Sequence, residues 1–254
     1  MRVVPLASSS KGNAYAVEAN GTVVLIDCGV SFKCLRERLA ARPEAAGIDL
    51  GAVAAVLVTH NHADHTQGLR VLLKRLGEVP LYANSLTAEA VAAQEGLPDE
   101  AFVCFENGQE FEVGGLGVTP FSVPHDAADP VGYLVRDGRT TYFHGTDLGT
   151  PLDCIGLKLA EADVATLESN HDPVMLRRSG RAPSLIQRIA GPRGHLSNDQ
   201  ACDLVRRFAS PRLRGLDLGH LSCDCNAPHL AQAAMAETLR GMGRADVALR
   251  IDPP

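Results

Sequence analysis

The chain has 254 residues, of which 45% are hydrophobic, enough for one large core or two small ones. We expect a single domain over residues 1–254, because no linker or low-complexity segment divides them. The formal net charge of −6 argues against a protein held to nucleic acid by its overall charge, although a local basic patch remains open. No apolar stretch reaches the length of a membrane span, the first residues lack a signal-peptide core, and the seven cysteines are scattered. We therefore expect reduced thiols, no membrane contact and a cytoplasmic location.

Strands and helices alternate along the chain, which predicts an α/β layered fold with helices on both outer faces. Strands are predicted at residues 14–19, 22–26, 53–58, near 81, and at 102–105, 111–113, 118–123, 131–135, 140–143, 163–167, 213–218 and 247–251. Helices are predicted near residues 31–39, 69–76, 85–94, 151–160, after 198 and at 228–239. Asn20-Gly21 and Asp137-Gly138 are two-residue turn signals that predict hairpins.

A run of histidines follows one of the predicted buried strands. Residues 59–65 read Thr-His-Asn-His-Ala-Asp-His. In an extended loop His60 and His62 point to the same side, while Asp64 and His65 lie where a helix begins. Imidazole and carboxylate suit zinc, manganese or iron, and two neighbouring sets of ligands suit a two-metal centre. The alternative is a polar loop whose histidines occur by chance.

Further titratable side chains follow later strands, where layered α/β proteins commonly place their chemistry. They are His125, His144, Asp147, Glu168, His171, His195 and His220. We interpret His144 as a strand-end residue rather than a ligand. His171 is open between a substrate contact and a partner that steadies a ligand. Glu168 either orients an imidazole such as that of His195 or is a plain surface carboxylate.

The histidine run resembles the H-x-H-x-D-H signature of the metallo-β-lactamase fold superfamily, and the later single residues follow in that family's order. The resemblance covers nearly the whole chain and implies a four-layer αββα sandwich with a dinuclear site between its two sheets. It implies that one divalent ion is held by His60, His62 and His125. It implies that the second is held by Asp64, His65 and His220, with Asp147 as the bridge.

The aspartate at position 147 resembles members that cleave phosphodiesters and thioesters, since lactam-cleaving members usually have cysteine there. The segments 168–172, 194–198 and 220–226 resemble the YycJ/WalJ-like subfamily, which is linked to DNA exonuclease activity. The chain is too short for the inserted domain of the RNA-cleaving β-CASP relatives. His195 matches a histidine that assists the leaving group in the similar RNase Z enzymes.

These resemblances imply a two-metal phosphodiesterase or nuclease that uses zinc, manganese or iron. We expect a hydroxide that bridges the ions to attack phosphorus, with Asp64 orienting it and His195 protonating the departing oxygen. A glyoxalase II-like thioesterase that acts on a small thiol conjugate is the alternative, and a non-hydrolytic metal-binding or oxidoreductase member is a third class.

An arginine-rich segment supports a polyanionic substrate. Between residues 170 and 213, eight arginines outnumber three aspartates, a local charge of +5. Arginine suits bidentate contact with phosphate. We therefore take His171, Asn198, Arg177 and Arg178 as candidate contacts for DNA, less favourably RNA, or a small phosphodiester. A solvated helical face is the alternative.

Two other features stay open. The polar segment 8–13 reads as a simple connection, with an edge of the active site as the alternative, and its Lys11 departs from the glycine or serine common in relatives. Cys223 and Cys225, with Cys202 and His229, either form a structural zinc site or are ordinary thiols.

Overall fold

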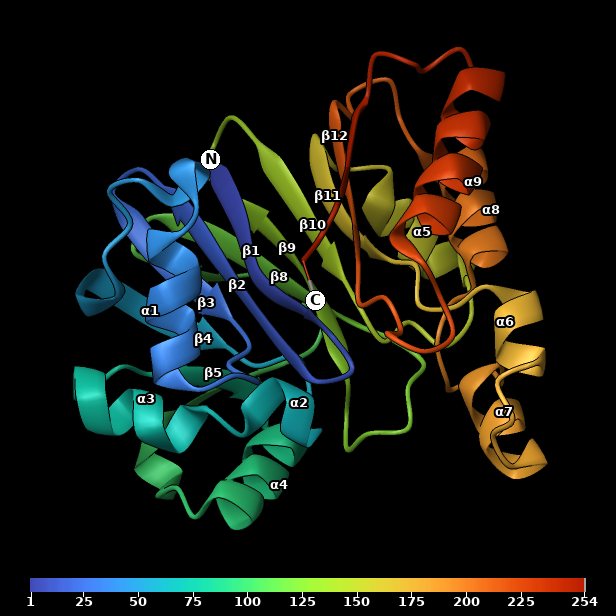
Figure 1. Cartoon of the computed structure of the whole chain (residues 1–254). Helices are drawn as coiled ribbons and strands as arrows, with labels where there is room; N and C mark the ends of the chain where they lie inside the picture. The colour runs from blue at the N-terminus through green and yellow to red at the C-terminus, as the bar shows by residue number, and fades with distance from the viewer. Residues whose placement is uncertain (254) are drawn as a thin grey trace.

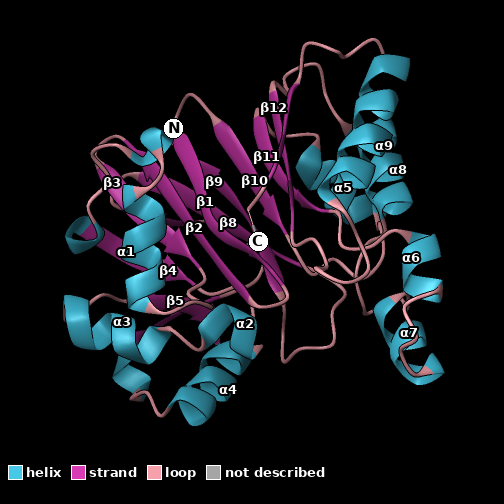
Figure 2. Cartoon of the chain, viewed as in Figure 1, coloured by secondary structure: helices cyan, strands magenta, loops and turns pink. Residues whose placement is uncertain are grey.

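The computed structural model describes residues 1–253 of the chain. Its strands form two sheets that face each other, and helices cover the outer face of each sheet (Figures 1 and 2). This is the four-layer αββα arrangement that the sequence resemblance implied. Among the described residues no helix is long and apolar enough to cross a bilayer.

The first sheet has six strands in sequence order: β1 (Arg2–Ser9), β2 (Gly12–Ala19), β3 (Thr22–Ile26), β4 (Val53–Leu57), β5 (Leu81–Asn84) and β6 (Phe102–Phe105). The first three strands are antiparallel, and β3 to β6 are parallel. Its helices are α1 (Phe32–Ala40), α2 (Ala63–Thr66), α3 (Leu69–Leu76) and α4 (Ser85–Glu95). Ser31 caps α1 by accepting a hydrogen bond from the backbone N–H of Cys34, as expected of a serine at this position.

The second sheet has seven strands in the order β13-β12-β11-β10-β9-β8-β7. They are β7 (Phe111–Val113), β8 (Leu116–Ser122), β9 (Val131–Arg136), β10 (Thr141–Gly145), β11 (Val164–Glu168), β12 (Gly215–Gly219) and β13 (Ala248–Ile251). Its helices are α5 (Asp153–Leu159), α6 (Pro173–Arg177), α7 (Pro183–Ile189), α8 (Asn198–Phe208) and α9 (Pro228–Gly241). Short 3₁₀ turns lie at Pro43–Ala45, Leu50–Ala52 and Asp99–Ala101.

The hydrophobic core has three layers. A central cluster lies between the sheets and includes Tyr15, Leu57 and Tyr133. One outer cluster packs the first sheet against α1, α3 and α4, and the other packs the second sheet against α5, α8 and α9. Strands buried on both faces read as continuous apolar runs, which is why strands such as β4 were recognisable from sequence.

Two segments differ from the sequence-based expectation. No strand was expected before residue 14, but β1 covers Arg2–Ser9 and β2 starts at Gly12, so the polar segment 8–13, read as a connection, is a tight hairpin between buried strands. Small hydroxyl and amide side chains fit this buried position because they are hydrogen-bonded there. The arginine-rich segment contains α6 and α7, which were not predicted because each is short and begins with proline instead of a long apolar pattern.

The strand directions bring the polar loops to one end of the molecule. In the second sheet β8, β10, β11 and β12 all run the same way, because β9 is antiparallel to both β8 and β10. Their carboxyl ends therefore meet at one edge of the sheet. The loop after β4 of the first sheet reaches the same place, as the ring contact between His60 and His125 shows.

Candidate metal centre

The seven side chains expected to bind metal lie together at this edge. Three groups of them have ligand atoms within 4.8 Å of one another. The groups share members, so they form one continuous cluster of imidazoles and carboxylates. They are His60, His62 and His125, then His60, His65 and Asp147, then Asp64, His65 and His220. Clusters of this composition are typical of divalent metal sites.

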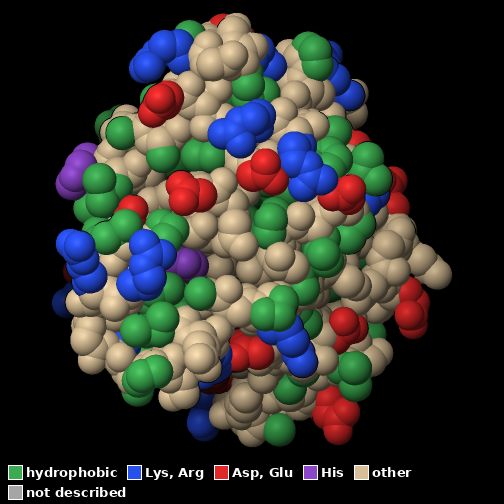
Figure 3. All heavy atoms as spheres, turned by 90° about the vertical axis from the view of Figure 1, so that its right-hand side faces the viewer, with side chains coloured by type: hydrophobic (Ala, Val, Ile, Leu, Met, Phe, Trp, Pro, Cys, Tyr) green, Lys and Arg blue, Asp and Glu red, His purple; other side chains and the backbone are tan. Residues whose placement is uncertain are grey.

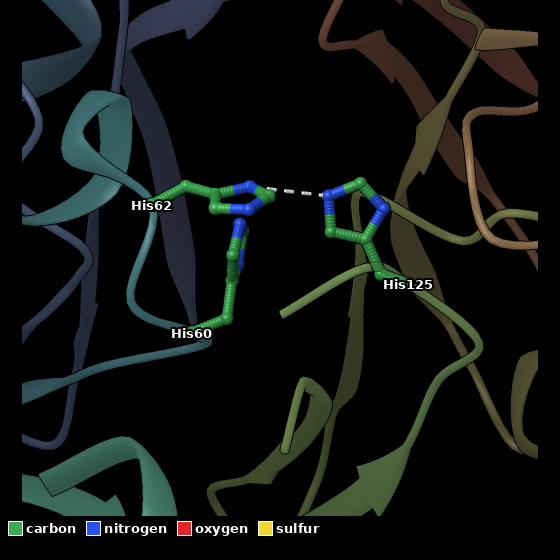
Figure 4. A group of neighbouring side chains, drawn as sticks. All are labelled: His60, His62 and His125. Atoms are coloured by element: carbon green, nitrogen blue, oxygen red, sulfur yellow. Dashed lines mark hydrogen bonds between the residues drawn. The ribbon is translucent and has the colours of Figure 1, made fainter. Parts of the chain in front are cut away.

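The first group is built from the loops after β4 and β8. Figure 4 shows the rings of His60, His62 and His125 turned toward a common space, with Nε2 of His125 3.3 Å from Nδ1 of His62. Nδ1 of His125 donates to the carbonyl of Gly194 at 2.9 Å. Because this bond fixes the proton on Nδ1, Nε2 of His125 keeps its lone pair for a metal.

The second group is positioned by a buried carboxylate at the end of β3. Nδ1 of His65 donates to Oδ2 of Asp27 at 2.7 Å, and the backbone N–H and hydroxyl of Thr59 donate to the same carboxylate at 2.8 Å each. Nε2 of His65 is thereby turned toward Asp64, whose Oδ2 lies 3.6 Å away. Nε2 of His220 lies at the same distance from that oxygen. The sequence analysis did not assign Asp27 this orienting role.

Asp147 lies between the two groups. Its Oδ1 is 3.5 Å from Nε2 of His125, and its Oδ2 is 3.3 Å from Nε2 of His65. Among the described non-glycine residues, four have positive φ, and three of them belong to this cluster or support it: Asp27, Asp147 and His220. Left-handed backbone is costly for such residues, and it is commonly retained at functional sites.

Three buried ligand atoms in the cluster have no hydrogen-bond partner: Nε2 of His60, Oδ2 of Asp147 and Nε2 of His220. Unpaired buried polar atoms are costly unless something else satisfies them, and a divalent ion would satisfy all three. Burial, with the charge of His65, holds the pKa of His60 well below its usual range, so the imidazole is neutral, as a metal ligand must be. Burial alone would raise the pKa of the Asp147 carboxyl. The surrounding histidines have the larger, opposite effect and bring this pKa well below its usual range. The donor set therefore fits divalent metal ions.

Glu168 is fully buried and orients two imidazoles, so the surface-carboxylate reading is wrong. Its Oε1 accepts hydrogen bonds from Nδ1 of His195 at 2.7 Å and Nδ1 of His220 at 3.1 Å. Its Oε2 accepts from the backbone N–H groups of Leu148 and Leu196, both at 2.9 Å. The four bonds leave this carboxylate little capacity to bind an ion, although it lies close enough to the cluster to do so.

His195 stands at the rim of the cluster, with Nδ1 3.4 Å from Oδ1 of Asp147 and 22% of its side chain exposed. Burial lowers its pKa, but Glu168 and Asp147 outweigh burial, and the net pKa is raised above its usual value. An imidazole held in this way can carry a proton near neutral pH and deliver it to a group in the open space beside it.

A cleft of about 230 Å³ opens over the cluster. Side chains of the cluster and His195 form its floor, while Ser10 and Ser222 lie at its edge. Its outer wall belongs to α7 and the residues just before it. These wall residues are Arg181, Leu185, Arg188 and Ile189.

The hairpin between β1 and β2 supports the cluster directly. Nδ2 of Asn13 donates to Oδ2 of Asp64 at 3.2 Å, and the backbone N–H of His220 donates to Oγ of Ser8 at 2.6 Å. The segment 8–13 is therefore an edge of the site, which was the less favoured of the two readings. Only the small polar composition of the segment could have indicated this.

The residues predicted to contact substrate lie elsewhere. Arg177 and Arg178 are exposed at the end of α6 and do not line the cleft. Asn198 is buried, and its amide bonds internally to Ser169 and Asn226. His171 is buried away from the cleft, with Nδ1 unpaired. The arginines at the cleft are instead positions 181 and 188, which sequence reasoning counted only as part of the basic segment.

Two remaining sequence questions have structural answers. His144 is buried within β10 beside the hydroxyl of Tyr142 and belongs to none of the potential metal groups found among residues 1–253, as expected of a strand residue. Cys202, Cys223 and Cys225 likewise take part in no such group in the described chain, and all seven cysteines are free thiols.

The Beta-lactamase superfamily domain matches residues 22–249. The chain belongs to this superfamily. It is 34% identical to Exodeoxyribonuclease WalJ of Streptococcus pneumoniae, across 97% of this chain and 90% of that protein. It is 33% identical to Exodeoxyribonuclease YycJ of Bacillus anthracis, across 94% and 89%. The superfamily member is thus a WalJ/YycJ-like hydrolase, as the sequence resemblance indicated.

The fold is shared with Zn(2+)-bound PqqB from Methylobacterium extorquens, with a TM-score of 0.72 and 19% identity over 100% of this chain and 99% of that one. At this identity the likeness concerns the metallo-β-lactamase fold alone. It agrees with the two facing sheets and the outer helices described above.

Proposed function

We propose that this superfamily member is a metal-dependent exodeoxyribonuclease that hydrolyses phosphodiester bonds with two divalent ions. The observation that carries the proposal is the shared position of Asp147 between two imidazole-rich groups, with His195 beside it at the rim of an open cleft. Paired metal sites of this kind suit in-line displacement at phosphorus. The names of the WalJ and YycJ relatives support DNA as the substrate.

In this proposal His60, His62 and His125 would hold one divalent ion and Asp64, His65 and His220 the other, and Asp147, which lies between the two groups, would serve both. Zinc and manganese suit imidazole and carboxylate ligands, and iron is a third candidate. The free thiols of the chain support a reducing, cytoplasmic location.

Divalent ions bound here would lower the pKa of a coordinated water and neutralise charge on the phosphoryl oxygens. The chain's own contribution is orientation and proton transfer. Asp64 lines the cleft, where its carboxylate can direct the attacking oxygen. His195 protonates the leaving oxygen, and Glu168 keeps its ring in the correct tautomer by accepting a hydrogen bond from Nδ1–H.

The four predicted substrate residues that do not line the cleft are given two different roles. Arg177 and Arg178 are exposed cations that we propose contact the strand beyond the cleft. Asn198 and His171 lie behind the cleft wall, where Asn198 accepts the hydroxyl hydrogen of Ser169 and its N–H donates to the carbonyl of His171. We propose that they act on the substrate indirectly, by holding these loops.

A substrate panel tests the proposal. Protein loaded with manganese or with zinc is offered end-labelled single- and double-stranded DNA, RNA, a bis-aryl phosphate and a glutathione thioester. We expect stepwise shortening of DNA and hydrolysis of the bis-aryl phosphate, both lost on chelation. Cleavage of the thioester alone would establish the glyoxalase II-like alternative, and shortening of RNA alone would reassign the substrate.

A further inference from the structure

The helix α7 lines the cleft without being packed into the hydrophobic core. None of its residues is buried, whereas each of the other α-helices in the described chain buries at least one. Figure 1 shows α6 and α7 beyond the helices that cover the second sheet. Core packing therefore does not account for the position of this helix over the cleft.

Ion pairs join the segment to neighbouring loops near both ends. Before α7, Nη2 of Arg181 lies 2.9 Å from Oδ2 of Asp224, in the loop after β12. Near its end, Nε of Arg188 lies 2.6 Å from Oδ2 of Asp126, in the loop after β8. The segment thus spans the cleft between two loops that also carry members of the metal cluster, since His125 and His220 lie in them.

The face turned toward the cleft has a defined chemical pattern. Leu185, Arg188 and Ile189 recur at the spacing of one face of α7, Arg181 lies just before the helix, and all four line the cleft. Two arginines and two aliphatic side chains thus line the cleft from this segment, with Leu185 between the arginines and Ile189 after the second. A strand of nucleic acid has the complementary pattern, because its phosphates are anionic and its bases and sugars present apolar surface.

Arg181 and Arg188 line the cleft, whereas most other arginines between residues 170 and 213 do not. Figure 3 shows acidic and basic side chains intermingled on the face that carries the C-terminal helices, so this face has no uniform basic field. Arg206 and Arg207 pair with Asp203, and Arg212 pairs with Asp163, all away from the cleft. Arg181 and Arg188 combine a carboxylate partner with a place in the cleft lining.

Resting on the proposed function, we infer that Arg181 and Arg188 bind phosphates of a single DNA strand in the cleft, and that Asp224 and Asp126 hold them until the strand arrives. One partner of each ion pair is mostly exposed, so water screens the pair and it contributes little, whereas arginine and phosphate form a charge-assisted bidentate pair. Phosphates can therefore displace the carboxylates at small cost.

The size of the cleft favours a single strand. At about 230 Å³ it is smaller than the roughly 300–1,000 Å³ that drug-sized ligands occupy. It therefore has room for a phosphodiester and its adjoining sugar from one strand, not for a base-paired duplex. α7 is also joined to the proposed proton donor, because the backbone N–H of His195 donates to the carbonyl of Ile189 at 2.9 Å.

Removing either partner of the Arg181–Asp224 pair separates this role from a structural one. We measure binding of the metal-loaded protein to a short, labelled single-stranded phosphorothioate oligonucleotide by fluorescence anisotropy. Arg181→Gln should weaken binding about tenfold and lower the salt slope by about 0.7, the loss of one phosphate contact. Asp224→Asn should tighten binding about twofold, because it frees the arginine and removes a repelling charge. Arg181→Lys should recover part of the affinity.

Arg206→Gln is the matched control, since it removes an arginine of the same segment that does not line the cleft. Its binding should equal that of the wild type. If Arg181→Gln and Asp224→Asn weaken binding alike, the pair is structural and the inference is wrong. It is also wrong if neither variant changes binding or if duplex binds as tightly as single strand. Cleavage by the wild type is scored separately, so failure to cut DNA would count against the proposed function alone.

Discussion

Glu168 holds His195 through a hydrogen bond of 2.7 Å between Oε1 and the ring Nδ1. The same oxygen lies 3.1 Å from Nδ1 of His220. One buried carboxylate thereby sets the orientation of the proposed proton donor and of a proposed metal ligand. This arrangement connects the metal cluster to the cleft, and it makes the roles of the three side chains separable by mutation.

Replacing His195 with alanine should slow turnover and leave the metal ions in place. General acid catalysis contributes about 10²- to 10⁴-fold, so kcat on DNA should fall by that order. Steady-state kinetics and metal analysis of the same preparation check this. His229→Ala, at an exposed position on α9, is the control and should behave as the wild type. Unchanged turnover in His195→Ala removes the assignment.

Glu168→Gln should reduce both turnover and metal affinity, because the Glu168 carboxylate accepts hydrogen bonds from the rings of His195 and His220. Partners that orient metal ligands contribute about 10- to 100-fold. Because part of the effect passes through His195, Glu168→Gln should cost less kcat in the His195→Ala background than in the wild type. Strictly additive losses in this double-mutant cycle would show that Glu168 does not act through His195.

Metal binding should stabilise the fold, because three buried ligand atoms of the cluster otherwise lack partners. A ligand present at about 100 times its Kd adds roughly 2.7 kcal/mol. For a chain of this size we expect chelation to lower Tm by about 5–10 °C, and zinc or manganese to restore it. Thermal unfolding followed by circular dichroism measures the change. A Tm that stays the same when chelator or metal is added would contradict the prediction.

Asp163 makes an acid-sensitive contribution to stability that does not depend on the metal centre. Burial raises its pKa, but hydrogen bonds from Arg212 and the backbone N–H of Thr141 outweigh burial and lower it. The pKa of Asp163 is therefore lower in the folded chain than in the unfolded chain. Asp163 stabilises the fold fully at pH values above its unfolded pKa, and this stabilisation is lost as the pH falls through its folded pKa.

Asp163→Asn should therefore lower the free energy of unfolding by about 1–3 kcal/mol at neutral pH, and its difference from the wild type should shrink below about pH 4. Urea unfolding at a series of pH values tests this. The control is Asp153→Asn, which alters an ion pair whose carboxylate is 73% exposed and should change stability by less than about 0.5 kcal/mol. A difference that grows as the solution is acidified would contradict the sign.

Local patterns predicted most strands and the histidine run from His60 to His65, whereas His125, Asp147 and His220 were implied as ligands only by the family resemblance. Buried strands such as β4 are continuous apolar runs, and the residues from His60 to His65 are adjacent in the chain. The layering of the sheets came from the family resemblance, since periodicity does not say how two sheets pack.

The parts that sequence reasoning missed depend on contacts between distant residues. Ser8 supports His220 across 212 positions, and nothing local marks that serine. Arg181 and Arg178 are three residues apart and alike in sequence, yet only Arg181 reaches the cleft, because the break between α6 and α7 turns the chain there. Side-chain direction at such a break is a tertiary property.

Elemental analysis of the freshly isolated protein, purified without chelator, tests the central claim most directly. We predict about two divalent ions per chain in the wild type, and about one each in His60→Ala and His220→Ala, because these changes remove ligands from different halves of the cluster. A wild-type chain that contains no divalent ion, and whose phosphodiesterase activity is indifferent to chelator, would contradict the account.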